Sequence, residues 1–307
     1  MIDQTRIVIE SVTPCVDGGR FAVKAVAGDT LEVGADIWKD GHELLKASVM
    51  WRKLAPEELE AHCLPKPPSL KKKEWKEARL ASDYTFNDRW FGKLTLDEVG
   101  PYAFTVVAWT DLYGSWCEEL KKKMAANQDV HSELLEGVAL FEQVAAKGKG
   151  PGKNAILEKV AAIKAAPDSV AKARIALSHE MQGLMERNDP RFDLTAFDAE
   201  IPLWADRERA RFGAWYEMFP RSCANLAAGA PADTRKGTTF REAEWRLKQI
   251  ADLGFDVLYL PPIHPIGTSH RKGPNNSETC NPGDPGSPWA IGAPEGGHTA
   301  VHPDLGT

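Results

Sequence analysis

Short apolar segments in which hydrophobic and polar residues alternate or cluster between turns dominate the first third of the chain. Four of them are rich in β-branched and aromatic residues and are separated by Asp-Gly, Gly-Asp and Lys-Asp-Gly turns: RIVIESV, RFAVKAVAG, TLEVGADIW and ASVMWRKL. A later stretch, NDRWFGKLTLDEVGPYAFTVVAWTD, has the same character and turns at Val99-Gly100-Pro101. Short strands at this spacing predict a β-sandwich over residues 1–112.

Between these strands, residues 56–80 are polar and rich in lysine. Such a segment is typical of a solvated loop or an exposed helix face. Anion binding by Lys71, Lys72 and Lys73 is the alternative interpretation.

The hydrophobic period changes after Trp109. Between residues 116 and 184, apolar residues recur at intervals of three and four, which is the spacing of amphipathic helices. A Gly-Lys-Gly-Pro-Gly run and an Ala-Pro-Asp-Ser run separate neighbouring helices, and Asp168 or Ser169 can cap the helix after the second break. We therefore predict a helical insertion over residues 113–200, used for packing or subunit contact, because its stripes carry no Glu-x-x-His pair for a cofactor.

A third pattern begins near Pro202. Residues 211–222, RFGAWYEMFPRS, predict a buried strand rich in aromatics. Residues 238–255 place apolar side chains on one face of a helix and have Gly254 at the expected stop. The apolar run FDVLYL, residues 255–260, then predicts a second strand. Strand, loop, helix and strand form one right-handed crossover of a parallel sheet.

A proline-rich segment follows this second strand. Nine of the 21 prolines lie between residues 261 and 303, and proline both ends a strand and fixes the departing backbone. The carboxyl ends of parallel strands are where α/β proteins hold their ligands. We therefore interpret the segment as a substrate-side loop and not as a disordered tail.

Composition narrows the classes of function. The 307 residues include 44 acidic and 38 basic residues, for a net charge of -6, and the basic residues form no nucleic-acid footprint. The chain start lacks a signal-peptide layout and no apolar run approaches the roughly 18 residues of a membrane span, so we expect a cytoplasmic protein. The five cysteines are far apart, and we expect them to be reduced, without a disulfide framework or a zinc site.

Several of these segments together carry a resemblance. RFGAWYEMFPRS, LGFDVLYLPPIHPIG, HRKGPNN and SPWAIGAPEGGHTAVHPDLGT resemble the maltosyltransferases of the α-amylase superfamily that transfer maltose from maltose 1-phosphate to α-1,4-glucan. The upstream NDRWFG and AWTD segments are similar to the N-terminal domain of that family, so the resemblance covers essentially the whole chain. The KGPNN run and the Pro/Gly-rich loop ending in HPDLGT are its narrowest features.

The resemblance implies a multidomain architecture that agrees with the pattern. We expect an all-β, immunoglobulin-like sandwich, an inserted helical bundle that helps to form a homodimer, and the first strands of a (β/α)₈ barrel over residues 201–307. A complete barrel takes about 250 residues, more than follow the helical segment. The chain is therefore expected to be an N-terminal portion of a longer enzyme, inactive by itself.

The same resemblance implies a hexosyltransferase active in glycogen or α-glucan synthesis by a retaining double displacement, with no cofactor or metal. Such enzymes use an aspartate nucleophile and a glutamate acid/base, which the family carries on later strands. We therefore expect both beyond Thr307 and assign no catalytic residue here. Asp284, Glu295 and Asp304 are not expected to act as the nucleophile.

Three residues are candidate substrate contacts. The resemblance implies that Lys272, the first residue of KGPNN, contacts the maltose 1-phosphate donor, and a lysine ammonium can donate to sugar hydroxyls or phosphate. An exposed loop lysine is the alternative. Asn275 and Asn276 either bond the sugar or hold the turn in left-handed conformations.

Other loop residues are weaker candidates for contacts with the substrate. We expect Arg271 to be solvated. The four histidines match no usual zinc spacing and are expected to support the loop or contact sugar: His264, His270, His298 and His302. Trp289 either stacks on a glucose ring or closes the loop.

Two other functions stay open. A hydrolase of the same superfamily would release reducing sugar from α-glucan with water as the acceptor and without phosphate. A non-catalytic protein would bind glucan through its sandwich and dimerise through its helices.

Overall fold

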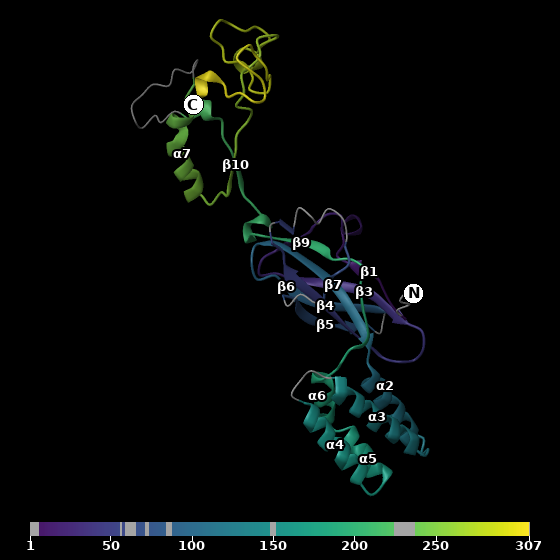
Figure 1. The fold of residues 1–307 in the computed structure, drawn as a ribbon. Coiled ribbons are helices and arrows are strands. Elements are labelled where there is room, and N and C mark those ends of the chain that lie inside the picture. Colours follow the sequence, from purple (N-terminus) through teal and green to yellow (C-terminus); the bar gives the residue numbers. More distant parts are fainter. Residues whose placement is uncertain are drawn as a thin grey trace. The chain divides into compact units, whose positions relative to one another are not determined.

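The computed structural model describes residues 6–55, 57–58, 66–70, 74–83, 88–147, 152–223 and 237–306. Within it the chain divides into two compact units, Met1–Glu208 and Arg209–Thr307 (Figure 1). The lysine run 71–73, proposed above as an alternative anion site, lies outside the described residues, as does Cys63.

A nine-stranded sheet forms the larger part of the first unit. Its strands follow the order β1-β3-β6-β5-β4-β7-β9-β2, with β8 also paired to β7, and all pairs are antiparallel except β2 with β9. Because β1 also approaches β7 and β8 across the interior, the sheet is curled around one core. The strands are β1 (Ile7–Thr13), β2 (Val23–Val26), β3 (Thr30–Lys39), β4 (Leu45–Lys53), β5 (Lys76–Ser82), β6 (Arg89–Thr95), β7 (Gly100–Thr110), β8 (Phe192–Ala196) and β9 (Ile201–Asp206).

Alternation along the strands explains this core. In β3, Val33, Ala35 and Ile37 alternate along the strand and are buried in the core, while the polar Asp36 between them is only partly buried. Phe104 of β7 is fully buried in the same cluster. The predicted β-rich region is thus confirmed.

Three strands fall where the sequence predicted something else. β5 begins in the segment expected to be a solvated loop or helix face. The pattern misled because Lys76, Glu77 and Arg79 are exposed, and only Ala78 and Leu80 of this strand pack against the core. β8 and β9 return from the helical segment to pair with β7. The expected boundary between helical insertion and barrel, at residue 200, therefore falls between two strands of this sheet.

Between β7 and β8, the described residues form five helices. Their apolar stripes meet in a second core that includes Phe141, Ile156 and Met181, so the amphipathic pattern predicted the helices correctly. Asp168 caps its helix by accepting the N–H of Ala171. The helices are α2 (Leu112–Ala125), α3 (His131–Lys147), α4 (Lys153–Ala165), α5 (Ser169–Ala176) and α6 (His179–Arg187).

The second unit contains a parallel pair of strands with a helix between them in sequence: β10 (Trp215–Glu217), α7 (Phe240–Asp252) and β11 (Val257–Tyr259). The predicted helix and the predicted parallel pairing are confirmed. The prediction of a buried strand over residues 211–222 is wrong, because β10 has three residues and Trp215 is 65% exposed. A strand is buried only where neighbours cover both of its faces, and β10 pairs with β11 alone among the described strands.

The described residues also form single turns of 3₁₀ helix: η1 (Asp17–Gly19), η2 (Glu208–Ala210), η3 (Pro220–Ser222), η5 (Pro274–Asn276) and η6 (Pro303–Leu305). In the described part of the chain, no helix combines the length and the apolar character that crossing a bilayer requires. The four described cysteines, Cys15, Cys117, Cys223 and Cys280, are free thiols.

Candidate functional site

The candidate site lies where β11 ends and the proline-rich loop 261–306 begins. A capping box starts α7, since Thr239 Oγ1 accepts the Glu242 N–H and the Glu242 carboxylate accepts the Thr239 N–H. Ala243 and Ile250 of this helix pack against Met218 beside β10. The helix thereby supports the strand pair from which the loop departs.

The loop folds back on itself through backbone hydrogen bonds. The Gly267 N–H donates to Ala290 O at 2.7 Å, and the Gly292 N–H donates to Pro265 O at 2.9 Å. The His302 N–H donates to Ile263 O at 2.8 Å, which brings the end of the loop back to its beginning. These bonds order a long segment that contains no strand or α-helix within residues 261–306.

Lys272, the predicted donor contact, is half-buried in this loop and has no hydrogen bond or ion pair to another described residue. Asn275 and Asn276 have φ values of 52° and 61°. Asparagine tolerates this left-handed region better than most residues, so both hold the turn. Sugar contact by either asparagine stays a prediction.

Arg271 is not solvated, contrary to expectation. Its Nε donates to Gly267 O at 3.1 Å and its terminal nitrogens donate to Ile266 O at 2.8 Å and Asp284 O at 3.3 Å. The guanidinium is thus a cross-link between two distant stretches of the loop. The sequence pattern contains no signal for it, because the partners are backbone carbonyls.

A second arginine, Arg221, was not singled out from the sequence. It lies in η3, 3.7 Å from Asp304 Oδ2 of η6, and its two terminal nitrogens are buried without a hydrogen bond to any described residue. Burial lowers the pKa of Arg221, although Asp304 opposes the shift. Burial and the Arg221 charge also lower the pKa of His302, whose Nδ1 accepts the Asp304 N–H at 3.1 Å.

The other histidines and Trp289 have mainly local contacts. His264 Nδ1 lies 3.0 Å from Ala300 O, and the His264 ring lies 5.6 Å from that of His298. Within the described ranges, no group of three or more His, Cys, Asp or Glu side chains is arranged to hold a metal. The rings of Trp289 and Phe219 pack edge to face, with their centroids 5.7 Å apart. Trp289 is nevertheless 57% exposed, so its ring can still stack on a ligand.

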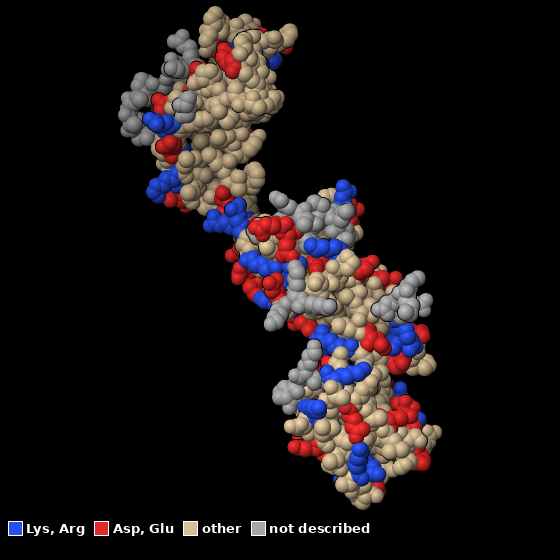
Figure 2. All heavy atoms as spheres, in the orientation of Figure 1, with Lys and Arg blue, Asp and Glu red and all other residues tan. Residues whose placement is uncertain are grey.

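The loop also encloses a shallow groove of about 620 Å³ that is open to solvent. Its walls are residues 267–269, 290–294, 296 and 297. Most of these are glycine, alanine or hydroxyl residues, so the groove offers backbone groups and the hydroxyls of Thr268 and Ser269. Figure 2 shows that the face of this unit it draws is mostly free of charged atoms, whereas Lys, Arg, Asp and Glu are interspersed over the first unit. The uncharged lining of the groove suits neutral hydroxyl groups better than a strongly charged ligand.

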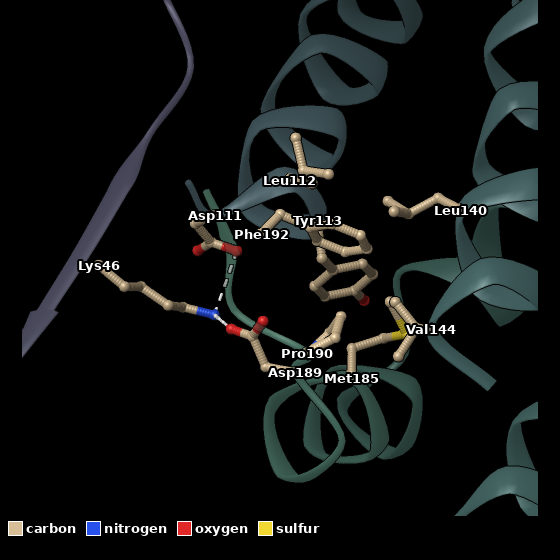
Figure 3. Close-up of a pocket in the computed structure, with 10 residues that line it drawn as sticks. All are labelled: Lys46, Asp111, Leu112, Tyr113, Leu140, Val144, Met185, Asp189, Pro190 and Phe192. Atoms are coloured by element: carbon tan, nitrogen blue, oxygen red, sulfur yellow. Dashed lines mark ion pairs between the residues drawn. The ribbon is translucent and has the colours of Figure 1, made fainter. Parts of the chain in front are cut away.

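A hollow in the first unit lies at the joint between sheet and helices (Figure 3). Lys46 reaches from β4 to Asp111 at the start of α2 (3.1 Å) and to Asp189 after α6 (3.6 Å). The opposite wall is apolar and includes Tyr113 and Phe192. With an accessible volume of about 10 Å³, it holds at most one water, so we interpret it as a structural joint.

Trp109 reinforces this joint. Its indole N–H donates to Asp189 Oδ2 at 2.9 Å. The guanidinium groups of Arg79 and Arg191 lie 4.6 and 4.5 Å from its ring. The joint therefore fixes how the helices leave the sheet.

The chain is similar to known proteins over nearly its whole length. Residues 5–207 match the family described as α-1,4-glucan:maltose-1-phosphate maltosyltransferase, domain N/S. The chain is 43% identical to the α-1,4-glucan:maltose-1-phosphate maltosyltransferase of Myxococcus xanthus over 304 residues, which cover 98% of this chain and 43% of that relative. The relative of the same name from Cereibacter sphaeroides is 42% identical over 303 residues, covering 98% and 46% of the two chains.

The relative of that name from Mycobacterium tuberculosis is 39% identical over 314 residues, which cover 98% of this chain and 44% of the relative. The chain thus spans less than half the length of these three curated relatives. Since the family match alone covers well over half of the residues, the chain belongs to the α-1,4-glucan:maltose-1-phosphate maltosyltransferase family.

Proposed function

We propose that this chain is part of an enzyme that moves maltosyl units from α-maltose 1-phosphate to the non-reducing end of α-1,4-glucans, in glycogen or α-glucan synthesis. The observation that carries the proposal is the similarity over 98% of the chain to relatives of that name, which extends through the loop that bears Lys272. Sequence similarity at about 40% identity over both units supports a shared reaction better than a shared fold would alone.

We further propose an architecture for the intact protein. The curled sheet corresponds to an immunoglobulin-like sandwich, interrupted between β7 and β8 by a helical insertion that contributes to a homodimer. The parallel pair β10 and β11, with α7 between them in sequence, corresponds to the start of a (β/α)₈ barrel in a cytoplasmic enzyme. Because β9 belongs to the sheet, we place the start of this barrel after Glu208.

In the proposed reaction Lys272 binds the donor. Its ammonium group supplies three N–H donors and a positive charge, and it has no competing partner among the described residues. It lies beyond the carboxyl end of β11, where barrel enzymes hold their substrates. The groove formed by other residues of the same loop offers uncharged hydrogen-bonding groups to the sugar.

We place the catalytic carboxylates in the part of the relatives that this chain does not span. Retaining enzymes need an aspartate or glutamate nucleophile and an acid/base with carboxyl groups about 5–5.5 Å apart. The loop carboxylates have other roles here: Asp284 accepts the Asn281 N–H, and Asp304 faces Arg221. Residues 1–307 alone should therefore not turn over the donor.

The experiment measures phosphate release from maltose 1-phosphate in the presence of glycogen. A complete maltosyltransferase that contains residues 1–307 should release phosphate and lengthen the glucan, and its Lys272→Met variant should show a raised KM for the donor. Residues 1–307 alone should release none. Release of reducing sugar from glycogen without any need for phosphate would instead identify a hydrolase, and phosphate release by residues 1–307 alone would show that the carboxylates are misplaced.

A further inference from the structure

We propose that Arg271 is a positioning residue that fixes the backbone from which Lys272 reaches the sugar donor. The inference rests on the proposed function for the role of Lys272, but its structural half concerns only the loop. Arg271 itself is not placed against the substrate; it acts through its neighbour.

Arg271 joins atoms from two separate stretches of the loop. Its three hydrogen bonds end on the carbonyls of Ile266, Gly267 and Asp284, so one side chain ties together the beginning and the middle of the loop. A guanidinium group carries five N–H donors in a rigid planar fork. A lysine ammonium, a single point at the end of a flexible stem, cannot serve carbonyls spread over this arc in the same way.

The loop leaves space for the Arg271 side chain at Gly286. Gly286 has φ of 77°, and a Cβ built on it would lie 2.9 Å from Arg271 Cγ. Any other residue at position 286 would be strained in its backbone and would press on the arginine. The loop therefore closes around this side chain and does not merely touch it.

The backbone on the other side of Lys272 is also held in place. The Gly273 N–H donates to Ser277 O at 2.9 Å, and a Cβ at position 273 would collide with the carbonyl oxygen of Thr279. The left-handed turn at Asn275 and Asn276 follows directly. Lys272 is thus bracketed by two fixed points.

This bracketing explains how a lysine in a long loop can bind with precision. The ammonium group is left without a protein partner among the described residues, while the backbone that carries it is held on both sides. Preorganisation of this kind reduces the ordering that donor binding must otherwise impose. A shift of about 1 Å in a contact group can lower kcat/KM by as much as about 100-fold.

The test is a double-mutant cycle in a complete maltosyltransferase that contains this chain, with phosphate release from maltose 1-phosphate as the readout. Arg271→Lys keeps the charge and should lower kcat/KM about 10- to 100-fold, mainly through KM. If Arg271 acts through Lys272, adding Arg271→Lys to Lys272→Met should cost little more than Lys272→Met alone. Independent, multiplicative losses would overturn the proposal, as would an unchanged Arg271→Lys enzyme.

A matched control and a second measurement separate this inference from the proposed function. Arg241→Lys, on the exposed side of α7, should leave kcat/KM unchanged. Hydrogen exchange of residues 1–307 should show faster exchange in the loop of Arg271→Lys, with unchanged exchange in β4 and β7 as the folding control. Unchanged loop exchange would show that Arg271 does not position the loop, whatever Lys272 does. An unaffected Lys272→Met enzyme with faster loop exchange in Arg271→Lys would instead refute the donor contact, and with it the claim that Arg271 acts through Lys272.

Discussion

The two units of this chain are stabilised in different ways. In the first unit, Val33, Phe104 and Phe141 are fully buried in two apolar cores. Among the described residues of the second unit, the apolar cluster has three buried members, Met218, Ala243 and Ile250, with residues such as Tyr216 partly buried against them. Trp215 and Trp289 are more than half exposed.

Where little apolar surface is buried, order comes from other contacts. Apolar area removed from water stabilises the sheet and the bundle. The second unit depends more on directed contacts: the capping box of α7, the backbone bonds across the loop, and the Arg271 cross-link. A region held in this way can present polar groups to a ligand, because fewer of its side chains are committed to a core.

A substitution in the core of the first unit should lower stability most. Phe104→Ala should lower the free energy of unfolding by about 3–5 kcal/mol, because it leaves a cavity in a packed core. Urea unfolding followed by circular dichroism measures this loss. The control, Phe212→Ala at a side chain that is 63% exposed, should change stability by less than about 0.5 kcal/mol. Equal losses would mean that burial does not distinguish the two units.

The next effect concerns the joint between sheet and helices. Lys46→Met leaves Asp111 and Asp189, 15% and 14% exposed, without their shared cation, at a cost of about 1.5–3 kcal/mol. Calorimetry measures the loss, and hydrogen exchange should quicken first in α2 and α6. Lys122→Met removes an ion pair on the same bundle whose lysine is 77% exposed and should cost under about 0.5 kcal/mol. Similar values for the two variants would show that the joint is no stronger than a surface pair.

A smaller effect tests the directed contacts of the second unit. Thr239→Ala removes one half of the capping box of α7 and should cost about 1 kcal/mol. Amide exchange in α7 should then quicken by a factor of about five. Thr239→Ser keeps the hydroxyl and should exchange like the wild-type chain; if it behaves like the alanine variant, the cap is not the cause.

The smallest effect is a pH dependence in the first unit. Burial, the largest single effect, would raise the pKa of Glu77, but the hydrogen bonds from Arg191 and the charges of Arg191 and Arg79 together outweigh it and hold the pKa below the usual 4.5. A lowered folded-state pKa means that the stabilisation is present above the unfolded pKa and is lost as pH falls through the folded pKa.

Glu77→Gln should therefore be slightly less stable than the wild-type chain at pH 7, by under about 1 kcal/mol because the pair is partly exposed. Urea midpoints at pH 7 and below pH 4 measure the gap, which should close in acid. A gap of constant size would assign the effect to packing and not to charge.

The sequence predicted the elements whose signals are local. The alternation of Val33, Ala35 and Ile37 predicted β3, and the apolar stripe that ends at Gly254 predicted α7 with its stop. Strand β5 was missed because charged residues dominate it. Strands β8 and β9 were missed because their partner β7 lies far away along the chain.

The candidate site was predicted less completely, because its contacts also join residues that are far apart along the chain. Lys272 was identified through its resemblance to a family motif, and no hydrophobic pattern points to it. Arg271 and Arg221 were missed as structural residues because their surroundings, the carbonyls of Ile266 and Asp284 and the carboxylate of Asp304, come together only in the folded loop. Side-chain contacts with remote backbone leave no trace in periodicity.

The central claim is that the loop after β11 presents Lys272 to the maltosyl donor. The most direct test is a crystal structure of a complete maltosyltransferase containing this chain, bound to an unreactive analogue of maltose 1-phosphate. We predict that Lys272 Nζ lies within about 3.2 Å of a donor oxygen, with the Arg271 cross-link intact. A donor bound elsewhere, with Lys272 turned toward solvent, would contradict the account.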